Sequence, residues 1–222
     1  MAPRWARLVG GAQIGVAPMK SRPHGNPASS GRPGPHERLA RDNRHVQALE
    51  KITPALDEDE LMAIVAAQAL PFVLVLDCVQ DPHNLGAILR TADAAGVHAV
   101  VTTKDKAVGI TETVRRVSVG AADHVPFAQV TNLARTMEKL KAAGLWLVGT
   151  SDRATKSIYQ IDLKGPLALV LGAEEKGMRR LTEENCDFLA SIPMAGKVEC
   201  LNVSVAAGVC LFEAVRQRQP GV

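Results

Sequence analysis

Five polar residues have side chains of the kinds that hold a substrate and stabilise charge: Asn84, Arg90, Glu174, Asn202 and Ser204. The set contains one permanent cation, one carboxylate and three small hydrogen-bonding groups. Such groups can position two reactants and stabilise developing charge. No serine lies in a GxSxG elbow and no Cys–His pairing is evident, so covalent hydrolysis has no clear nucleophile. The set therefore suits a reaction whose leaving group is already activated.

The glycine-containing loops and the cysteines exclude several other kinds of site. Segment 172–178, "GAEEKGM", contains glycines, but not at the spacing of a dinucleotide-binding turn or a P-loop. The four cysteines form no CxxC pair and have no histidine partner at metal spacing; they are Cys78, Cys186, Cys200 and Cys210. We therefore expect no metal site, and we expect reduced thiols in a cytoplasmic protein.

The candidate residues also have simpler structural interpretations. Apolar residues recur at helical spacing in 199–218, "ECLNVSVAAGVCLFEAVRQR", so Asn202 or Ser204 can cap a core-facing helix. Taken alone, Arg90 is typical of an exposed helix arginine. Glu174 alone is typical of an acidic residue near a helix N-terminus, where the helix dipole favours it. One residue can have both a structural role of this kind and a role in an active site.

The elements that must position these residues alternate between strand and helix. Buried, β-branched strands separated by helices predict an α/β fold, with a mainly parallel sheet covered by helices on both faces. Ligands of such sheets bind at the carboxyl ends of the strands, where polar and glycine residues collect in this sequence. The expected strands are 72–77, 97–102, 145–150, 167–172 and 189–193, and the expected helices are 84–95, 111–121, 131–143, 178–186 and 202–217.

Composition divides the chain into two parts. The hydrophobic fraction is 46%, and no apolar run is long enough to cross a bilayer. The whole chain has a formal net charge of +3, whereas residues 1–45 alone carry +6. This segment also contains six prolines and six glycines. We expect a disordered basic tail and linker over 1–56 and one domain over 57–222. The tail is interpreted as inert or as a misassigned start, as an RNA-contacting arm, or as a transit peptide.

Three long motifs resemble those of a known family. "DPHNLGAILRTADAAGVHAVV", "LALVLGAEEKGMRRLTEENCD" and "SIPMAGKVECLNVSVAAGVCLFEAVRQR" resemble, in order and spacing, the motifs of the SpoU (TrmH-like) RNA ribose 2′-O-methyltransferases of the SPOUT superfamily. The resemblance runs from about residue 57 to 218. Within the family, "TNLARTMEKL" and the third motif are most similar to bacterial enzymes that methylate a guanosine in the peptidyl-transferase loop of 23S ribosomal RNA.

The resemblance implies S-adenosylmethionine as methyl donor, large-subunit ribosomal RNA as partner, a homodimer and a C-terminal trefoil knot. The family's catalytic positions fall on Arg90, Asn84, Glu174, Asn202 and Ser204. Its cofactor contacts fall on Gly172, Ile192, Leu201, Thr150 and Met194. Two departures from the family's pattern are a cysteine, Cys200, where many relatives carry serine, and a basic tail where bacterial relatives carry an RNA-binding domain.

Three other functions remain open at this point. One is methylation of tRNA, or of another ribosomal position, by an enzyme of the same family. The second is an RNA-binding or ribosome-assembly factor that has kept the fold without activity, and the third is a truncated, inactive product. The role of Arg90 is also open. A guanidinium is a poor base because it does not lose its proton, so binding a phosphate or stabilising the developing alkoxide is physically more favourable.

Overall fold

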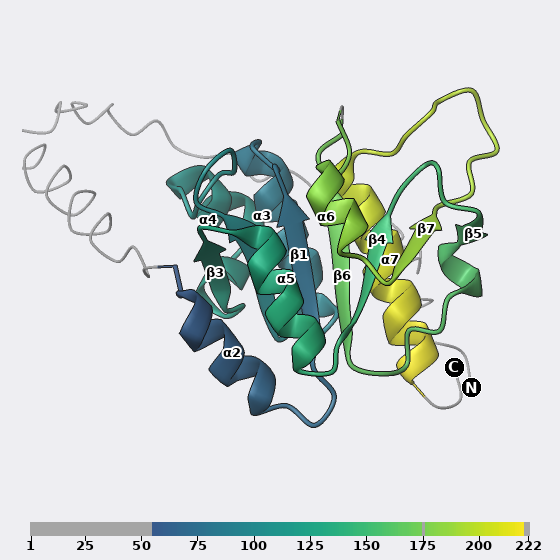
Figure 1. The fold of residues 1–222 in the computed structure, drawn as a ribbon. Coiled ribbons are helices and arrows are strands. Elements are labelled where there is room, and N and C mark those ends of the chain that lie inside the picture. The colour runs from purple at the N-terminus through teal and green to yellow at the C-terminus, as the bar shows by residue number, and fades with distance from the viewer. Residues whose placement is uncertain (1–54, 175, 220–222) are drawn as a thin grey trace, which may run out of the picture. The chain divides into compact units, whose positions relative to one another are not determined.

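The computed structural model describes residues 55–174 and 176–219, and in them the strands form one parallel sheet (Figure 1). The strand order is β3-β2-β1-β6-β4-β7-β5, and every pair of neighbours is parallel. This confirms the expected mainly parallel α/β architecture. The strands are β1 (Phe72–Asp77), β2 (Ala99–Thr103), β3 (Phe127–Val130), β4 (Trp146–Thr150), β5 (Lys156–Ser157), β6 (Leu167–Gly172) and β7 (Phe188–Ser191).

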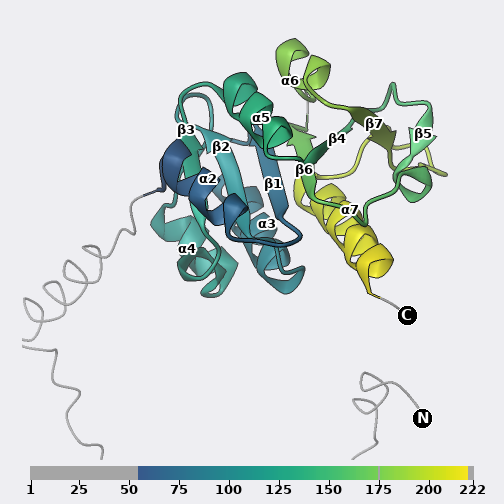
Figure 2. The ribbon, with the colours of Figure 1, turned by 60° about the horizontal axis from the view of Figure 1, so that its bottom comes forward.

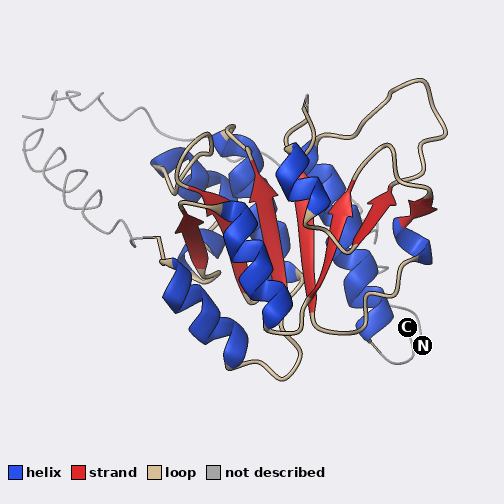
Figure 3. Cartoon of the chain, in the orientation of Figure 1, coloured by secondary structure: helices blue, strands red, loops and turns tan. Residues whose placement is uncertain are grey.

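Helices cover both faces of this sheet because the central strands are apolar on both sides. In β1, Phe72 and Leu74 pack into one core cluster, whereas Val73 and Val75 pack into the other. The first cluster lies under α3 (Pro82–Ala94), α4 (Glu112–Ser118) and α7 (Val203–Arg218). The second lies under α2 (Glu58–Ala66) and α5 (Leu133–Ala142), on the opposite face (Figures 2 and 3). The short helix α6 (Arg180–Glu184) contacts α5.

The structure differs from the expected elements mainly at short or irregular segments. The helix expected over 111–121 ends at Ser118, because Val119 and Gly120 adopt left-handed backbone angles, with φ of 53° and 92°. A 3-10 turn, η2 (Ala121–Asp123), follows. Strands β3 and β5 and the 3-10 turn η3 (Ile158–Gln160) are not among the expected elements. By contrast, β1 and β6 have the expected bounds.

The predicted basic tail lies almost entirely outside the described residues, which begin at 55. Leu56, which the sequence places in the linker, forms a parallel bridge with Ala128 of β3. Its N–H donates to the carbonyl of Phe127 at 2.8 Å. The ordered sheet therefore includes a residue before 57. Among the described residues, no helix has the length and apolar character needed to span a membrane.

Candidate active site

The carboxyl ends of the central strands meet at one edge of the sheet. Asp77 at the end of β1 lies opposite Gly172 at the end of β6, and Thr150 at the end of β4 lies opposite Ala190 of β7. Parallel strands present such ends side by side, together with the loops that follow them. The loops that contain the predicted site residues are therefore neighbours, as the sequence predicts.

Four of the five predicted catalytic residues form one hydrogen-bonded network, which we call the Glu174 network (Asn84, Glu174, Asn202 and Ser204). Oε1 of Glu174 accepts from Nδ2 of Asn84 at 3.3 Å, from Nδ2 of Asn202, and from the backbone N–H of Val203 at 3.0 Å. Nδ2 of Asn202 also donates to Oδ1 of Asn84 at 3.0 Å. Three chain segments, from α3, the turn after β6 and the start of α7, are thus joined at one carboxylate.

Local structure explains how each segment reaches the network. Asp81 caps α3 by accepting from the N–H of His83 at 2.8 Å, and Pro82 occupies the first helical position, which places Asn84 in the first turn. Asn202 caps α7, since its Oδ1 accepts from the N–H of Ser204 at 3.0 Å, and the Ser204 hydroxyl donates to the same oxygen. The capping interpretation of the cluster is therefore correct, and Asn202 belongs to the network as well.

Arg90 is the predicted catalytic residue that lies outside the Glu174 network. It is exposed on α3. It follows Asn84 by six residues, which places its side chain about 120° around the helix axis. Among the described residues, no ion pair involves Arg90. The structure therefore brings together the amide, hydroxyl and carboxylate groups of the predicted site, but not its cation.

The predicted cofactor residues lie along the same edge, on the side of β4 and β7. Thr150, Gly172 and Ile192 are at or just beyond the ends of β4, β6 and β7, and Leu201 directly precedes α7. In the described part of the chain, the backbone of 193–201 forms no hydrogen bond with other backbone groups.

Segment 193–201 is the loop between β7 and α7. Two of its apolar side chains, Met194 and Val198, are 40% and 67% exposed. Unpaired peptide groups beside apolar side chains suit the adenosine and methionine parts of S-adenosylmethionine. These residues therefore fit the cofactor that the family resemblance implies.

At Gly172, one of the predicted cofactor contacts, the chain's own backbone leaves no room for a side chain. A Cβ at this position would lie 2.1 Å from the carbonyl carbon of Gly177 and 2.2 Å from the nitrogen of Met178. The backbone there folds back as a tight turn, because Ala173 and Gly177 exchange N–H to carbonyl bonds of 3.1 and 2.8 Å. The chain itself occupies the space beside Gly172, and this turn carries Glu174.

We expect Gly172→Ala to displace this turn and thereby weaken both cofactor binding and methyl transfer. Overpacking of this kind destabilises a fold by about 1–3 kcal/mol, so the variant can still fold. Calorimetric titration with S-adenosylmethionine measures the effect. Gly165→Ala is the matched control, since its nearest contact would be Trp146 at 3.9 Å. Near-normal affinity in folded Gly172→Ala would show that the turn does not shape the cofactor site.

A cavity of about 610 Å³ adjoins the Glu174 network on the side of β1. Asn84, Glu174 and Val203 form part of its wall. Three cationic residues on the wall were not predicted from the sequence: Lys106, Lys176 and Arg179. The sequence signal that could have found Arg179 is Asp77, an acidic residue that ends the apolar segment "FVLVLD" and therefore needs a buried partner.

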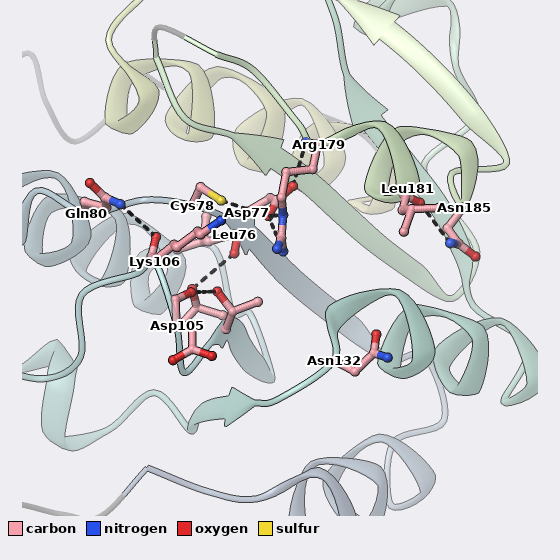
Figure 4. Close-up of polar contacts among 12 residues, drawn as sticks. Leu76, Asp77, Cys78, Gln80, Asp105, Lys106, Asn132, Arg179, Leu181 and Asn185 are labelled. Carbon is pink, nitrogen blue, oxygen red and sulfur yellow. Dashed lines mark hydrogen bonds and ion pairs between the residues drawn. The ribbon is translucent and has the colours of Figure 1, made fainter.

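Asp77 forms an ion pair with Arg179 of the cavity wall (Figure 4). The Asp77 side chain is fully buried, and its carboxylate accepts from the backbone N–H and from Nε of Arg179, both at 2.8 Å. Burial acts to raise the pKa of Asp77, but the hydrogen bonds from Arg179 outweigh it, and the pKa lies below its ordinary value. Burial, followed by the Asp77 charge, raises the pKa of the neighbouring Cys78 thiol.

We expect Arg179→Ala to lower the free energy of unfolding at pH 7 by about 2–3 kcal/mol. Removing one partner of a fully buried pair costs roughly 3–5 kcal/mol, and the half-exposed Arg179 side chain lets water replace part of the lost contact. Urea unfolding measures the change. Arg180→Ala is the matched control, because Arg180 pairs only with the exposed Glu184 among the described residues. An equal loss in the two variants would contradict the prediction.

The same pair predicts how stability depends on pH. Because the folded-state pKa of Asp77 is lower than its unfolded value of about 3.9, the contribution of the pair is fully present above that value. It is lost as the pH falls through the folded-state pKa. Unfolding free energies measured between about pH 5 and pH 2 should therefore fall less steeply in Asp77→Asn than in the native chain.

Comparison with known proteins agrees with this geometry. The SpoU rRNA Methylase family matches residues 71–212. The chain is 57% identical, over 192 residues, to the 23S rRNA (guanosine-2′-O-)-methyltransferase RlmB of Ralstonia nicotianae, covering 84% of this chain and 76% of the relative. It is 64% identical over 154 residues to RlmB of Pseudomonas aeruginosa, covering 69% and 62%.

Solved structures show the same fold. The crystal structure of the SpoU methyltransferase AviRb from Streptomyces viridochromogenes, in complex with the cofactor AdoMet, superposes with a TM-score of 0.66 at 32% identity. The match covers 74% of this chain and 66% of AviRb. The relative with bound cofactor thus shares the sheet, and its likeness extends over most of the described residues.

Proposed function

Because this chain belongs to the SpoU rRNA Methylase family, we propose that it transfers a methyl group from S-adenosylmethionine to the ribose 2′-oxygen of a guanosine in 23S ribosomal RNA. Relatives at 57–64% identity carry this activity in their names. The observation that carries the proposal is the Glu174 network, which joins the three family motifs at one carboxylate. Within the family's range of substrates, we place the target in the peptidyl-transferase loop, and the site of action in the bacterial cytoplasm.

The network suits a reaction that needs positioning more than covalent chemistry. When bound, S-adenosylmethionine supplies a methyl group on a sulfonium, which is already activated. Thr150, Gly172, Ile192, Met194 and Leu201 would hold this cofactor. Asn84, Asn202 and Ser204 would orient the ribose, and Glu174 fixes their side chains in place. Correct placement of two reactants is worth roughly 7–11 kcal/mol of the barrier.

Arg90 would supply the positive charge that the network lacks. Its exposed position on α3 leaves its guanidinium accessible to RNA. Since a guanidinium remains protonated, we assign it the binding of a neighbouring phosphate or the stabilisation of the developing alkoxide. In the second role, the positive charge would stabilise the negative oxygen as the 2′-hydroxyl proton passes to water. In the first role, Arg90 would hold the RNA strand in place.

The direct test is methyl incorporation into unmodified ribosomal RNA. Purified protein, radiolabelled S-adenosylmethionine and 23S transcripts should give methylation of one guanosine, located by a ribose-methylation mapping method. A tRNA pool serves as the comparison substrate. Methylation of tRNA in place of 23S RNA would assign the chain to another branch of the family. Cofactor binding without methylation of either RNA would favour the assembly-factor alternative.

Two further family properties are proposed on the basis of α7. Val205 and Phe212, seven residues apart on α7, are 51% and 48% exposed, and we propose that this apolar stripe contributes to a homodimer interface. After β7, which lies between β4 and β5, the chain crosses through 192–202 and α7 then packs against α3 and β6 (Figure 1). This return from the β7 side of the sheet to its centre supports the C-terminal trefoil knot expected from the family. Sedimentation of Phe212→Asp against the native chain tests the interface, since a monomeric variant is expected.

A further inference from the structure

The cavity beside the Glu174 network carries cationic side chains that the catalytic network does not use. Its cations come from three separate segments: Lys106 from the loop after β2, Lys176 from the turn after β6, and Arg179 from the residue that precedes α6. We call this the cationic cavity (Lys106, Lys176 and Arg179). Lys106 and Lys176 are exposed, whereas Arg179 is already paired with Asp77.

The two carboxylates of the same wall, Asp81 and Glu174, are held in place by hydrogen bonds. Glu174 accepts three hydrogen bonds within its network, and Asp81 caps α3. No ion pair joins Lys106 or Lys176 to another of the residues that the structure describes. The ammonium groups of Lys106 and Lys176 are therefore available to an anionic ligand, whereas the charge of Arg179 is balanced by Asp77.

The backbone of the wall is held in an uncommon conformation. Cys78 and Lys106, just beyond the neighbouring strands β1 and β2, have φ values of 62° and 59°, a left-handed region that few residues other than glycine adopt. Nε2 of Gln80 donates to the carbonyl of Lys106 at 3.3 Å, and the N–H of Val108 donates to the carbonyl of Val79 at 3.0 Å. Figure 4 shows Gln80, Cys78, Lys106 and Arg179 gathered at this end of β1. Such strain persists where surrounding contacts fix it, often at ligand sites.

From these observations, and on the basis of the proposed function, we propose that the cationic cavity binds a backbone phosphate of the RNA strand beside the target nucleotide. The cavity shares Asn84 and Glu174 with the network, so a nucleotide held by the network has its flanking phosphate within the same recess. Cys78, Val79 and Met178 provide an apolar part of the wall for the adjoining sugar. The sulfonium of the cofactor is itself positive, so these cations repel it.

The experiment compares Lys106→Ala, Lys176→Ala and the double variant with the native full-length chain. The RNA is a 23S fragment that contains the peptidyl-transferase loop, and its dissociation constant is measured over a series of KCl concentrations. Each lysine that contacts a phosphate should contribute about 0.7 to the slope of log affinity against log salt. We expect each single variant to lower the slope by that amount and the double variant by about 1.4. Affinity for S-adenosylmethionine and kcat at saturating RNA should stay unchanged, while the KM for RNA rises.

Two control variants distinguish RNA binding at this cavity from a general effect of positive surface charge. Lys164→Ala removes an exposed lysine in the connection before β6, at the amino end of the sheet, and should leave the KM unchanged. Lys106→Arg keeps the charge and should keep the salt slope. An unchanged slope in the double variant would overturn the proposal, and so would a loss of cofactor affinity with normal RNA binding. If the native chain methylates no RNA, the proposed function fails, but the salt slopes still decide whether this cavity binds phosphate.

Discussion

Arg90→Ala should lower the rate of methyl transfer by at least about two orders of magnitude, which is typical for loss of a group that stabilises charge in a transition state. The affinity for S-adenosylmethionine should hardly change, because Arg90 of α3 is not among the residues predicted to hold the cofactor. Single-turnover methylation of the 23S fragment measures the rate, and calorimetry measures cofactor affinity. The fold should be unaffected, since the side chain is exposed.

Two further variants test whether the effect depends on the guanidinium group and on its position in the chain. Arg90→Lys should restore only part of the activity, because an ammonium cannot reproduce the planar, bidentate guanidinium. Arg135→Ala removes an exposed arginine from α5, on the opposite face of the sheet, and should methylate normally. Loss of cofactor binding by folded Arg90→Ala would refute the assignment, as would full activity in that variant.

The sheet could be predicted from sequence where its strands are buried on both faces. "FVLVLD" and "LALVLG" are continuous apolar segments with clear ends, and β1 and β6 have the predicted bounds. β3 and β5 could not be found in this way. β3 is a four-residue edge strand with a half-buried Gln129, and β5 contains only two residues. Their pairing depends on neighbours distant in sequence, which local periodicity does not report.

The residues of the candidate site also divide into those with a clear signal in the sequence and those without one. Asn84, Glu174 and Asn202 lie in long motifs, and their placement after strands predicts convergence at one edge. Lys106 and Lys176 carry no such signal, because an exposed lysine in a loop is the commonest kind of surface residue. Only the three-dimensional convergence of separate segments distinguishes these lysines from others. For Gly172, the motif predicts a cofactor contact, whereas the structure shows that a side chain there would collide with the backbone of the following turn.

Replacing Glu174 should reduce methyl transfer nearly as strongly as replacing Arg90, but through positioning. Glu174→Ala removes the acceptor for Asn84, Asn202 and the first N–H of α7. Freed side chains shift, and a misplacement of about 1 Å can cost about 10²-fold in rate. Because water can reach the partly exposed donors, we expect an unfolding cost of only about 1–2 kcal/mol. The decrease should appear in kcat more than in the KM for RNA.

Glu174→Gln distinguishes the charge of the carboxylate from its geometry. The amide oxygen can still accept hydrogen bonds, but a neutral acceptor binds donors about half as strongly as a carboxylate, so activity should lie between those of the native chain and Glu174→Ala. Glu184→Ala is the control, since among the described residues this exposed carboxylate pairs only with Arg180. Steady-state kinetics and urea unfolding are measured on the same preparations. If folded Glu174→Ala keeps its kcat, the network does not position the reacting ribose, and Asn202 acts only as the cap of α7.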